Sequence, residues 1–417
     1  MQYKIDTKVA RLIKILGRIS SQLRISAYLV GGPVRDLLLG KSNVDLDIAV
    51  NKDLEKLVQS LSKEFKAEFV YHRQFKTATL FLDALNIDMA TTRKEIYPSY
   101  GTLPQVRDSS LERDLFRRDF TINAMAVRIE RTGLGDIVDP YNGLSDLKNK
   151  KIRILHNKSF LDDPTRIIRA LRFQTRLGFG IERQTSSLLK EAVSRRMFSK
   201  VTAPRIGNEI VKLLKENEPL KAIKRLDEIC GLTFIHPKIK FNNKWNLFFR
   251  QADRYGLNFS KSSHKKIEHW IIYFIALMEN LNRDELDKLC RGFELKRQER
   301  MAILHASYLK VIIEGRMVEE ESPSIIYGKL KPMYPEAVIY IIAGLPVSNA
   351  RKKLFDLLVR FDQIDVGLDG EDLKKMGFIP GPIFNKILEA VFLARLDGRI
   401  FSRREETDFV QRNFSVT

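Results

Sequence analysis

The chain has 417 residues, 44% of them hydrophobic, so it is long enough for about two to four domains with a substantial core. Its 72 basic and 52 acidic residues give a net charge of +20, and its two cysteines, Cys230 and Cys290, form neither a CxxC pair nor a zinc-ligand spacing. We therefore exclude a disulfide framework and expect a cytoplasmic protein with no signal peptide. The longest apolar runs are WIIYFIALM and AVIYIIAGLPV, which we expect to form buried helices and not membrane spans.

Residues 1–150 mix helical and strand patterns. Apolar spacing predicts a helix over 6–24 and another at DLEKLVQSLSKEF, and it predicts strands at YLVGG, VDLDIAV, FVYHR, TATLFLD, NIDMATTR and INAMAVRIE, followed by a turn at DPYNG. Between Met89 and Phe116, two prolines, a glycine and mixed charges predict a loop. We expect an α/β (α+β) domain with a small mixed sheet.

From about residue 160 onward, strand signals nearly vanish and an all-helical array is expected. Helical spacing occurs in TRIIRALRFQTRL, SSLLKEAVSRR, IGNEIVKLL, KAIKRLDEI, KKIEHWIIYFIALMENL, ELDKLCRGF and KKLFDLLVRF. Residues 1–150 carry a net charge of +5 and residues 151–417 one of +15. This basic excess favours a polyanionic partner, nucleic acid first, over a generally basic soluble protein.

Two aspartates lie one residue apart in LVGGPVRDLLLGKSNVDLDIA, residues 29–49. Strand periodicity places Asp45 and Asp47 on one face, with apolar residues on the other. Adjacent carboxylates repel unless a cation lies between them, and Mg²⁺ prefers such hard oxygen ligands together with substrate phosphates. The preceding glycines suit close approach of the backbone to a phosphate. The structural alternative is a turn followed by a solvated strand face.

Three further elements carry candidate site residues. Asp88, in NIDMA, is a possible third carboxylate on a strand. FRRDFTINAMAVRI contains two arginines in an apolar stretch, and arginine gives bidentate, permanently charged phosphate contacts. In SFLDDPTRIIRALRF, Asp163 before a proline predicts a helix N-cap. A basic stripe follows at steps of three residues: Arg166, Arg169 and Arg172. A cap and a solvated helix face are the structural alternatives.

The order and spacing of these motifs resemble a known family. GGPVRDLLLG with DLD, RRDFTINAMA, DPYNG, DDPTRIIRALRF and APRIGNEIVKLL are similar to the bacterial and eukaryotic (class II) CCA-adding tRNA nucleotidyltransferases and poly(A) polymerases. RRDFTINAMA is the most specific motif, and the likeness is looser in LDGEDLKKMGFIPGPIFNKILEA. The resemblance implies a nucleotidyltransferase head over 1–150, a helical neck with the base-recognition helix over 151–215, a helical body over 216–330 and a tRNA-binding helical tail over 331–417.

The resemblance also implies an activity, the addition of CCA to tRNA 3′ ends from CTP and ATP. Asp45 and Asp47 would hold two Mg²⁺ ions, and the RNA 3′-hydroxyl would attack the α-phosphate in line with release of pyrophosphate. Asp88 and Arg118 would be further catalytic residues. The nucleotide-binding residues implied are Gly32, Arg35, Arg118, Asp119, Asn123, Asp163, Arg166, Arg169 and Arg172, among which Asp119 and Asn123 are supporting positions.

By the same resemblance, Asp163 and Arg166 would choose the base. A carboxylate accepts from the amino group of cytosine or adenine while a guanidinium donates to the ring nitrogen. Uracil and guanine present a carbonyl and an N–H in those places, so both contacts fail and polar groups stay unpaired. The family usually has Glu at the position of Asp162, which leaves the role of Asp162 open.

The implied partner is tRNA, gripped at its acceptor arm and elbow through salt-sensitive backbone contacts, and no membrane or protein partner is implied. A CC-only enzyme is disfavoured by the full-length segment 89–116. A poly(A) polymerase subtype is disfavoured because YHRQFKTATL lacks a Gly-Arg/Lys-Arg/Lys-Phe element. An A-only enzyme stays open, while the intact motif residues argue against a catalytically inactive RNA-binding module. None of the six histidines precedes an aspartate, so no phosphohydrolase module is expected.

Overall fold

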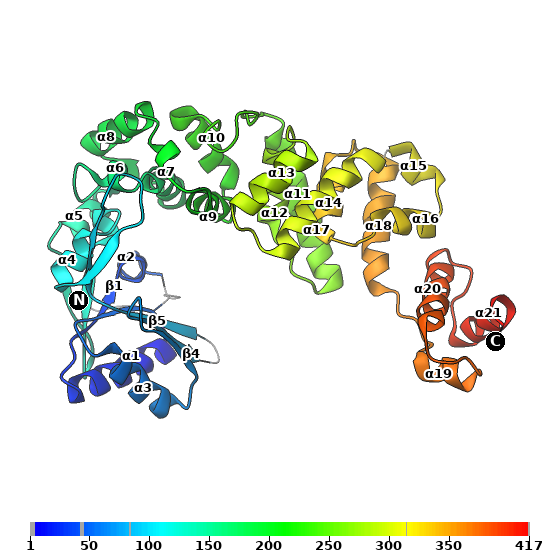
Figure 1. Ribbon diagram of the computed structural model, residues 1–417, viewed down its shortest axis with the longest axis horizontal. Helices are drawn as coiled ribbons and strands as arrows, with labels where there is room; N and C mark the ends of the chain where they lie inside the picture. Colours follow the sequence, from blue (N-terminus) through cyan, green and yellow to red (C-terminus); the bar gives the residue numbers. More distant parts are fainter. Residues whose placement is uncertain (1–4, 42–45, 83–84, 314, 416–417) are drawn as a thin grey trace. The chain divides into compact units, whose positions relative to one another are not determined.

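A computed structural model describes residues 5–41, 46–82, 85–313 and 315–415 (Figure 1). The chain forms two compact units. The first unit comprises Met1–Glu209 and Glu216–Cys230, and the second unit comprises Ile210–Lys215 and Gly231–Thr417. The finer division into neck, body and tail remains a prediction.

A seven-stranded mixed sheet lies at the centre of the first unit. Its strands, β1 (Ala27–Val30), β2 (Leu46–Val50), β3 (Phe69–His72), β4 (Thr77–Leu82), β5 (Leu85–Thr91), β8 (Ala126–Glu130) and β9 (Gly133–Val138), are ordered β3-β4-β5-β2-β1-β8-β9. Neighbouring strands are antiparallel except β2 and β5, which run parallel. The six predicted strands are present, and β9 adds a seventh.

Two amphipathic helices pack on this sheet. These are α1 (Thr7–Gln22) and α3 (Leu54–Phe65), both predicted, which lie beside each other in Figure 1. The apolar stripe of α1 faces β8 and β9, and that of α3 faces β3, β4 and β5. Leu16 of α1 and Leu57 of α3 are almost fully buried, as expected for the inward face of an amphipathic helix. The short helix α2 (Gly32–Leu38) follows β1 directly.

The loop prediction for the segment between Met89 and Phe116 is wrong. After β5, strands β6 (Arg93–Ile96) and β7 (Gln105–Asp108) form an antiparallel hairpin, and helix α4 (Leu111–Phe116) follows. The strand sequences RKEI and QVRD are polar and pair only with each other among the described strands. They lack the alternation of apolar and polar residues from which a strand is predicted.

Short helices and turns complete the first unit. They are η1 (Thr121–Asn123), α5 (Gly143–Lys148), α6 (Ser159–Asp162), α7 (Thr165–Leu177), α8 (Arg183–Ser194), η2 (Met197–Lys200) and α10 (Pro219–Cys230), with a two-stranded pair of β10 (Lys151–Ile152) and β11 (Gly180–Ile181). Helix α9 (Ala203–Leu214) begins in the first unit, and its residues from Ile210 onward belong to the second. The predicted helices TRIIRALRFQTRL, SSLLKEAVSRR, IGNEIVKLL and KAIKRLDEI correspond to α7, α8, α9 and α10.

The described residues of the second unit form helices and connecting loops without a strand, as predicted. It contains α11 (Trp245–Ser263), α12 (His269–Leu277), α13 (Arg283–Gly292), α14 (Arg297–Ile312), α15 (Gly315–Glu320), α16 (Pro323–Leu330), α17 (Pro335–Gly344), α18 (Asn349–Gln363), α19 (Gly370–Lys375), α20 (Pro382–Leu396) and α21 (Arg403–Asn413). The two longest apolar runs form α12 and α17, which are buried against α11 and α14. Across the described part of the chain, no helix has both the length and the apolar character that membrane crossing requires.

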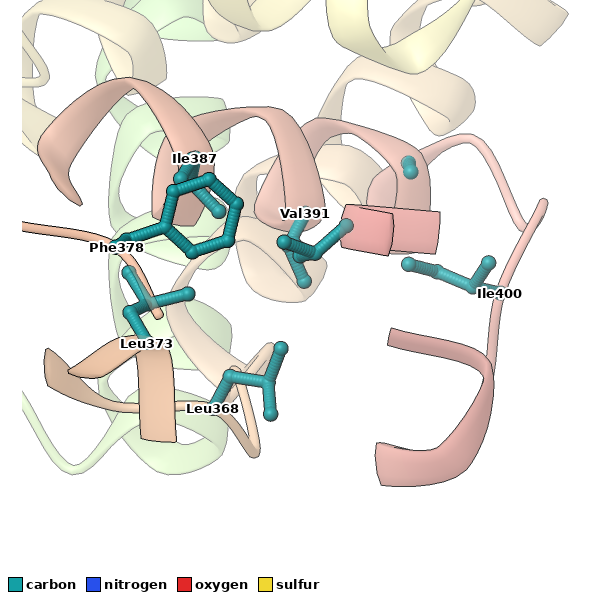
Figure 2. Packing of buried hydrophobic residues seen from close by; sticks show 8 residues of the cluster. Leu368, Leu373, Phe378, Ile387, Val391 and Ile400 are labelled. Atoms are coloured by element: carbon teal, nitrogen blue, oxygen red, sulfur yellow. The ribbon is translucent and has the colours of Figure 1, made fainter. Parts of the chain in front are cut away.

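The last three helices have a hydrophobic core of their own. Figure 2 shows Leu373, Phe378, Ile387, Val391 and Ile400 packed toward one another, and Ala394 and Val410 belong to the same buried cluster. A capping box at Asp369 fixes the start of α19. The segment LDGEDLKKMGFIPGPIFNKILEA therefore folds as one packed element with α21.

Candidate active site

A polar cavity of about 420 Å³ lies within the first unit, between α2, η1, α7 and the hairpin of β6 and β7. Arginines dominate its wall, so the cavity suits a ligand with several negative charges. The lining residues are Gly32, Arg35, Asp47, Glu95, Tyr97, Arg117, Arg118, Asp119, Asn123, Asp163, Arg166, Arg169, Phe173 and Arg176. Most of the predicted site residues thus come together in one place.

Asp47 and Asp88 are direct neighbours on the parallel strands β2 and β5. Both also line a second cavity of about 320 Å³, which shares Asp47, Arg117 and Arg118 with the first. Thr79 donates a hydrogen bond of 2.6 Å to Asp88 Oδ1. Paired carboxylate oxygens are the donor set that Mg²⁺ prefers, so these two side chains fit the predicted metal.

The alternation predicted for VDLDIA holds in its described part. Leu46 and Ile48 are 2% exposed, while Asp47 is half-buried on the opposite face. Asp45 lies outside the described residues, so its place beside Asp47 stays a prediction. The described residues contain no cluster of three or more His, Cys, Asp or Glu side chains that could hold a metal ion.

Arg118 lies against the turn that joins β1 to α2. Gly31 there has φ +78°, and a Cβ atom at this position would lie 2.3 Å from Arg118 Nη1. Asp114 accepts from Arg118 Nη2 at 3.2 Å, whereas Arg118 Nε is buried and has no hydrogen-bond partner among the described residues. Burial lowers the pKa of Arg118, and Asp114 opposes this shift. The glycine therefore makes room for a buried cation with a donor left over.

A hydrogen-bonded chain links α7 to α2 through η1. Arg169 donates to Asp119 Oδ2 from Nη2 at 2.6 Å and from Nε at 2.9 Å. Asn123 Nδ2 donates to Asp119 Oδ1 at 2.9 Å, and Asn123 Oδ1 accepts from Arg35 at 2.6 Å. Burial raises the pKa of Asp119, but Arg169 and the hydrogen bond from Asn123 outweigh it and lower the pKa to about 2. The chain holds Arg35, which is 3% exposed, at the cavity wall.

The predicted arginine stripe on α7 splits into two kinds of residue. Arg169 pairs with Asp119 and Glu209, so its charge is compensated within the protein. Arg172 lies 3.7 Å from Glu209 and 3.6 Å from Glu216, and it is not among the residues that line the cavity. Arg166 instead donates to neutral oxygens, the Ser159 hydroxyl at 2.5 Å and the Arg117 carbonyl at 2.7 Å. Of the three, Arg166 is the one without a salt bridge to a carboxylate among the described residues, although its charge still helps to lower the pKa of Asp119.

Asp163 both caps a helix and lines the cavity. Its Oδ1 accepts from the Thr165 N–H at 3.0 Å and from the Thr165 hydroxyl at 2.6 Å, at the start of α7. The N-cap residue itself is Pro164, so the prediction of Asp163 as N-cap with the proline at the first helical position is wrong by one residue. The same oxygen lies 2.7 Å from Arg205 Nη2. The cap interpretation and the ligand interpretation are therefore compatible. Asp162 instead lies 3.9 Å from His156, where burial raises the pKa of Asp162 and lowers that of His156 to about 4.

Several residues at the cavity were not predicted as site residues. Tyr97 donates to Glu95 at 2.9 Å, and Arg117 donates to the other oxygen of Glu95 at 2.9 Å. The Phe173 ring lies 5.1 Å from the Arg35 guanidinium, within cation–π range. Arg117 stood out in the sequence as part of RRDF, but Glu95 and Tyr97 lie in the segment mistaken for a loop.

Comparisons with known proteins agree with this geometry. The model of the Poly A polymerase head domain matches residues 27–153. The A-adding tRNA nucleotidyltransferase of Geobacter sulfurreducens is 35% identical over 95% of this chain, and the chain spans 46% of that relative, less than half its length. The A-adding tRNA nucleotidyltransferase of Halalkalibacterium halodurans is 29% identical over 100% of this chain and 95% of that relative.

A solved structure extends the likeness to both units. The Thermotoga maritima CCA-adding enzyme complexed with tRNA is 30% identical, with a TM-score of 0.66 over 99% of this chain and 97% of that one. The match therefore covers both units of the chain. This chain belongs to the family of tRNA nucleotidyltransferases and poly(A) polymerases.

Proposed function

We propose that this chain adds nucleotides to the 3′ end of tRNA without a template, and that its product is CCA made from CTP and ATP. One observation carries the proposal: a single cavity holds the pair Asp163 and Arg166 together with Arg118 and Asp47. The first two can read a base edge, and the last two suit the triphosphate end of the same nucleotide. The T. maritima relative, named a CCA-adding enzyme and solved with tRNA, supports tRNA as the acceptor.

The residues suit phosphoryl transfer by positioning and charge. Arg118 offers its unpartnered Nε, and Arg117 and Arg35, which are paired with Glu95 and Asp36, add oriented guanidinium groups at the same wall. Asp47 and Asp88, with Asp45, would hold Mg²⁺, which when bound lowers the pKa of the RNA 3′-hydroxyl and neutralises the phosphates. Orientation of the hydroxyl against the α-phosphate needs no covalent nucleophile from the protein.

Base choice follows from the atoms left over at Asp163 and Arg166. Both side-chain hydrogen bonds that Asp163 accepts from described residues use Oδ1, so Oδ2 remains to accept from an exocyclic amino group. Arg166 uses Nη1 and Nη2 for neutral oxygens and keeps further N–H groups for a ring nitrogen. Cytosine and adenine fit this pair, and uracil and guanine leave it unpaired.

The helical part supplies a basic surface for the acceptor. Residues 151–417 carry a net charge of +15, which supports salt-sensitive contacts with the phosphates of tRNA.

Cys230 and Cys290 are both free thiols, which supports a location in the cytoplasm.

Addition of the terminal A alone is the second candidate. It is favoured by the A-adding relative of H. halodurans, which this chain matches along its whole length. Asp163 and Arg166 do not separate the two products, because cytosine and adenine offer the same donor and acceptor to them.

The test uses three tRNA substrates, ending at the discriminator base, at C and at CC. Each is incubated with CTP alone, ATP alone or both, and the 3′ ends are sequenced. CCA addition predicts that CTP extends the first two substrates to CC and that ATP adds one A to the third. Extension of the CC substrate alone, by ATP alone, would replace the leading proposal with A addition. Absence of any addition would overturn both.

A further inference from the structure

Arg205 connects the base-reading carboxylate to the hairpin turn. It is the third residue of α9, and it is 18% exposed. One nitrogen, Nη2, lies 2.7 Å from Asp163 Oδ1. The other, Nη1, donates to the Gly101 carbonyl at 2.8 Å and more weakly to the Thr102 carbonyl at 3.4 Å. A single planar guanidinium thus serves two segments, since Gly101 and Asp163 are 62 residues apart in the chain.

The turn that Arg205 holds is itself tightly placed. The Gly101 N–H donates to the carbonyls of Leu161 and Asp162 at 3.1 Å each, at the end of α6 and just before Asp163. Gly101 has φ +77°, and a Cβ atom there would lie 2.7 Å from Lys200 Cβ and 2.8 Å from the Lys200 carbonyl oxygen. Because real Cβ atoms do not approach backbone so closely, a side chain at this position must move the turn.

The same turn begins at the cavity wall. Tyr97 opens the connection between β6 and β7 and lines the cavity, where its hydroxyl group is hydrogen-bonded to Glu95. A shift of the turn therefore reaches the cavity by two routes, through Tyr97 and through Arg205 to Asp163.

The orientation of Asp163 decides which oxygen a base can meet. Thr165 donates two hydrogen bonds to Oδ1, and Arg205 Nη2 lies 2.7 Å from the same oxygen, which leaves Oδ2 as the acceptor. The two donors of Thr165 are local to the helix start and neutral, so they restrain Oδ1 without compensating its charge. The charged contact from Arg205 supplies the second anchor.

We propose that Arg205 is a specificity-determining positioning residue, which fixes the Asp163 carboxylate for base reading and ties it to the turn at residues 99–102. The proposal rests on the function proposed above, since it assumes that Asp163 reads the incoming base. Arg205 itself is not expected to touch the nucleotide.

The test measures base preference in Arg205→Ala, Arg205→Lys and the control Arg195→Ala, which removes an exposed ion pair with Glu191 on α8. The readout is the ratio of kcat/KM for ATP to that for GTP on tRNA ending in CC. We expect loss of the Arg205–Asp163 ion pair to lower this ratio roughly tenfold or more for Arg205→Ala. Arg205→Lys is expected to lie between, because an ammonium group cannot serve both segments as a planar fork does. The control ratio should equal that of the wild type.

A double-mutant cycle separates positioning from general damage. Gly101→Ala moves the turn, so it should lower the ratio when Arg205 is present and add little in the Arg205→Ala background. Independent, additive effects of the two substitutions would overturn the coupling. Equal losses of rate for ATP and GTP, with the ratio unchanged, would reduce Arg205 to a structural role and overturn the proposal.

A separate measurement of nucleotide binding distinguishes failure of the proposed function from failure of the role proposed for Arg205. Dissociation constants for ATP and GTP are measured by calorimetry without tRNA for each variant. If the wild type binds ATP more tightly than GTP but adds nothing to tRNA, the proposed function fails. The ratio of the two dissociation constants in the Arg205 variants then still decides this inference. If the wild type adds nucleotides correctly and Arg205→Ala keeps the wild-type preference in binding and in turnover, this inference alone fails.

Discussion

Replacing Asp119 by asparagine should weaken the first unit by an amount that the structure sets. Asp119 is 7% exposed and receives two hydrogen bonds from Arg169, one from Asn123 and one from the Phe120 N–H. The fall of its pKa from 3.8 to about 2 corresponds to about 2 kcal/mol of stability at neutral pH. Asparagine keeps an acceptor oxygen but removes the charge, so we expect a loss of about that size.

The stabilisation has a defined pH range. Because the folded pKa lies below the unfolded value, the contribution is complete above about pH 4 and is lost as the pH falls toward about 2. Asp119→Ala should cost more, about 3 kcal/mol, since it also removes the acceptors of Arg169 and Asn123; Glu209 compensates part of the charge left on Arg169.

Hydrogen exchange is the appropriate assay, because both tryptophans, Trp245 and Trp270, lie in the second unit and fluorescence would report on that unit. A loss of about 2 kcal/mol predicts about 30-fold faster exchange for amides of α7 at pH 7. Amides of α17, in the second unit, serve as the internal control. Unchanged exchange in α7, or a difference that persists undiminished at pH 2, would refute the electrostatic account of Asp119.

Three further predictions concern the cavity, and one concerns tRNA. Asp47→Ala should abolish nucleotide addition in Mg²⁺ and leave tRNA binding nearly intact; more than a few per cent of residual rate would remove Asp47 from the metal site. Gly31→Ala should lower kcat/KM for every nucleotide by displacing Arg118, and a wild-type value would show that the contact is dispensable. Arg166→Ala should make U and G incorporation detectable, whereas Arg169→Ala should lower the melting temperature without changing base choice; the reverse pattern would exchange their roles. The affinity for tRNA should fall steeply between 50 and 200 mM salt, and a flat titration would exclude phosphate contacts as its main source.

The sequence predicts those helices and strands that bury one face, because the buried face appears as a regular spacing of apolar residues. Strand β2 is recognised because Leu46 and Ile48 are buried on one face while Asp47 is not. Helix α7 is recognised because Ile167, Ile168 and Leu171 repeat at helical spacing and are buried. In both cases the spacing of apolar residues along a few residues records which face is turned inward.

Other features depend on contacts that local spacing does not record. The hairpin of β6 and β7 has no buried face, so its polar strands carry no periodic signal. Arg166 and Arg169 look equivalent in the sequence, and only a pairing across 50 residues, between Arg169 and Asp119, distinguishes them. Arg205 is one basic residue among many in APRIGNEIVKLL, and nothing near it in the chain indicates a contact with Asp163.

The arginines on α7 differ in their partners, since Arg169 and Arg172 pair with carboxylates and Arg166 does not. This difference affects how new base preferences could be obtained by laboratory evolution. The Asp163 carboxylate contacts Arg205 and lines the same cavity as Arg166, whereas Arg169 and Arg172 neutralise buried acids. Folded proteins sit only slightly above the stability that function needs, so a mutant library survives only if its members stay folded. A library that randomises 163, 166 and 205 while fixing 169 and 172 therefore samples specificity at modest cost in folding. If positions 169 and 172 were randomised as well, most variants in the library would be unfolded and would give no information about base preference.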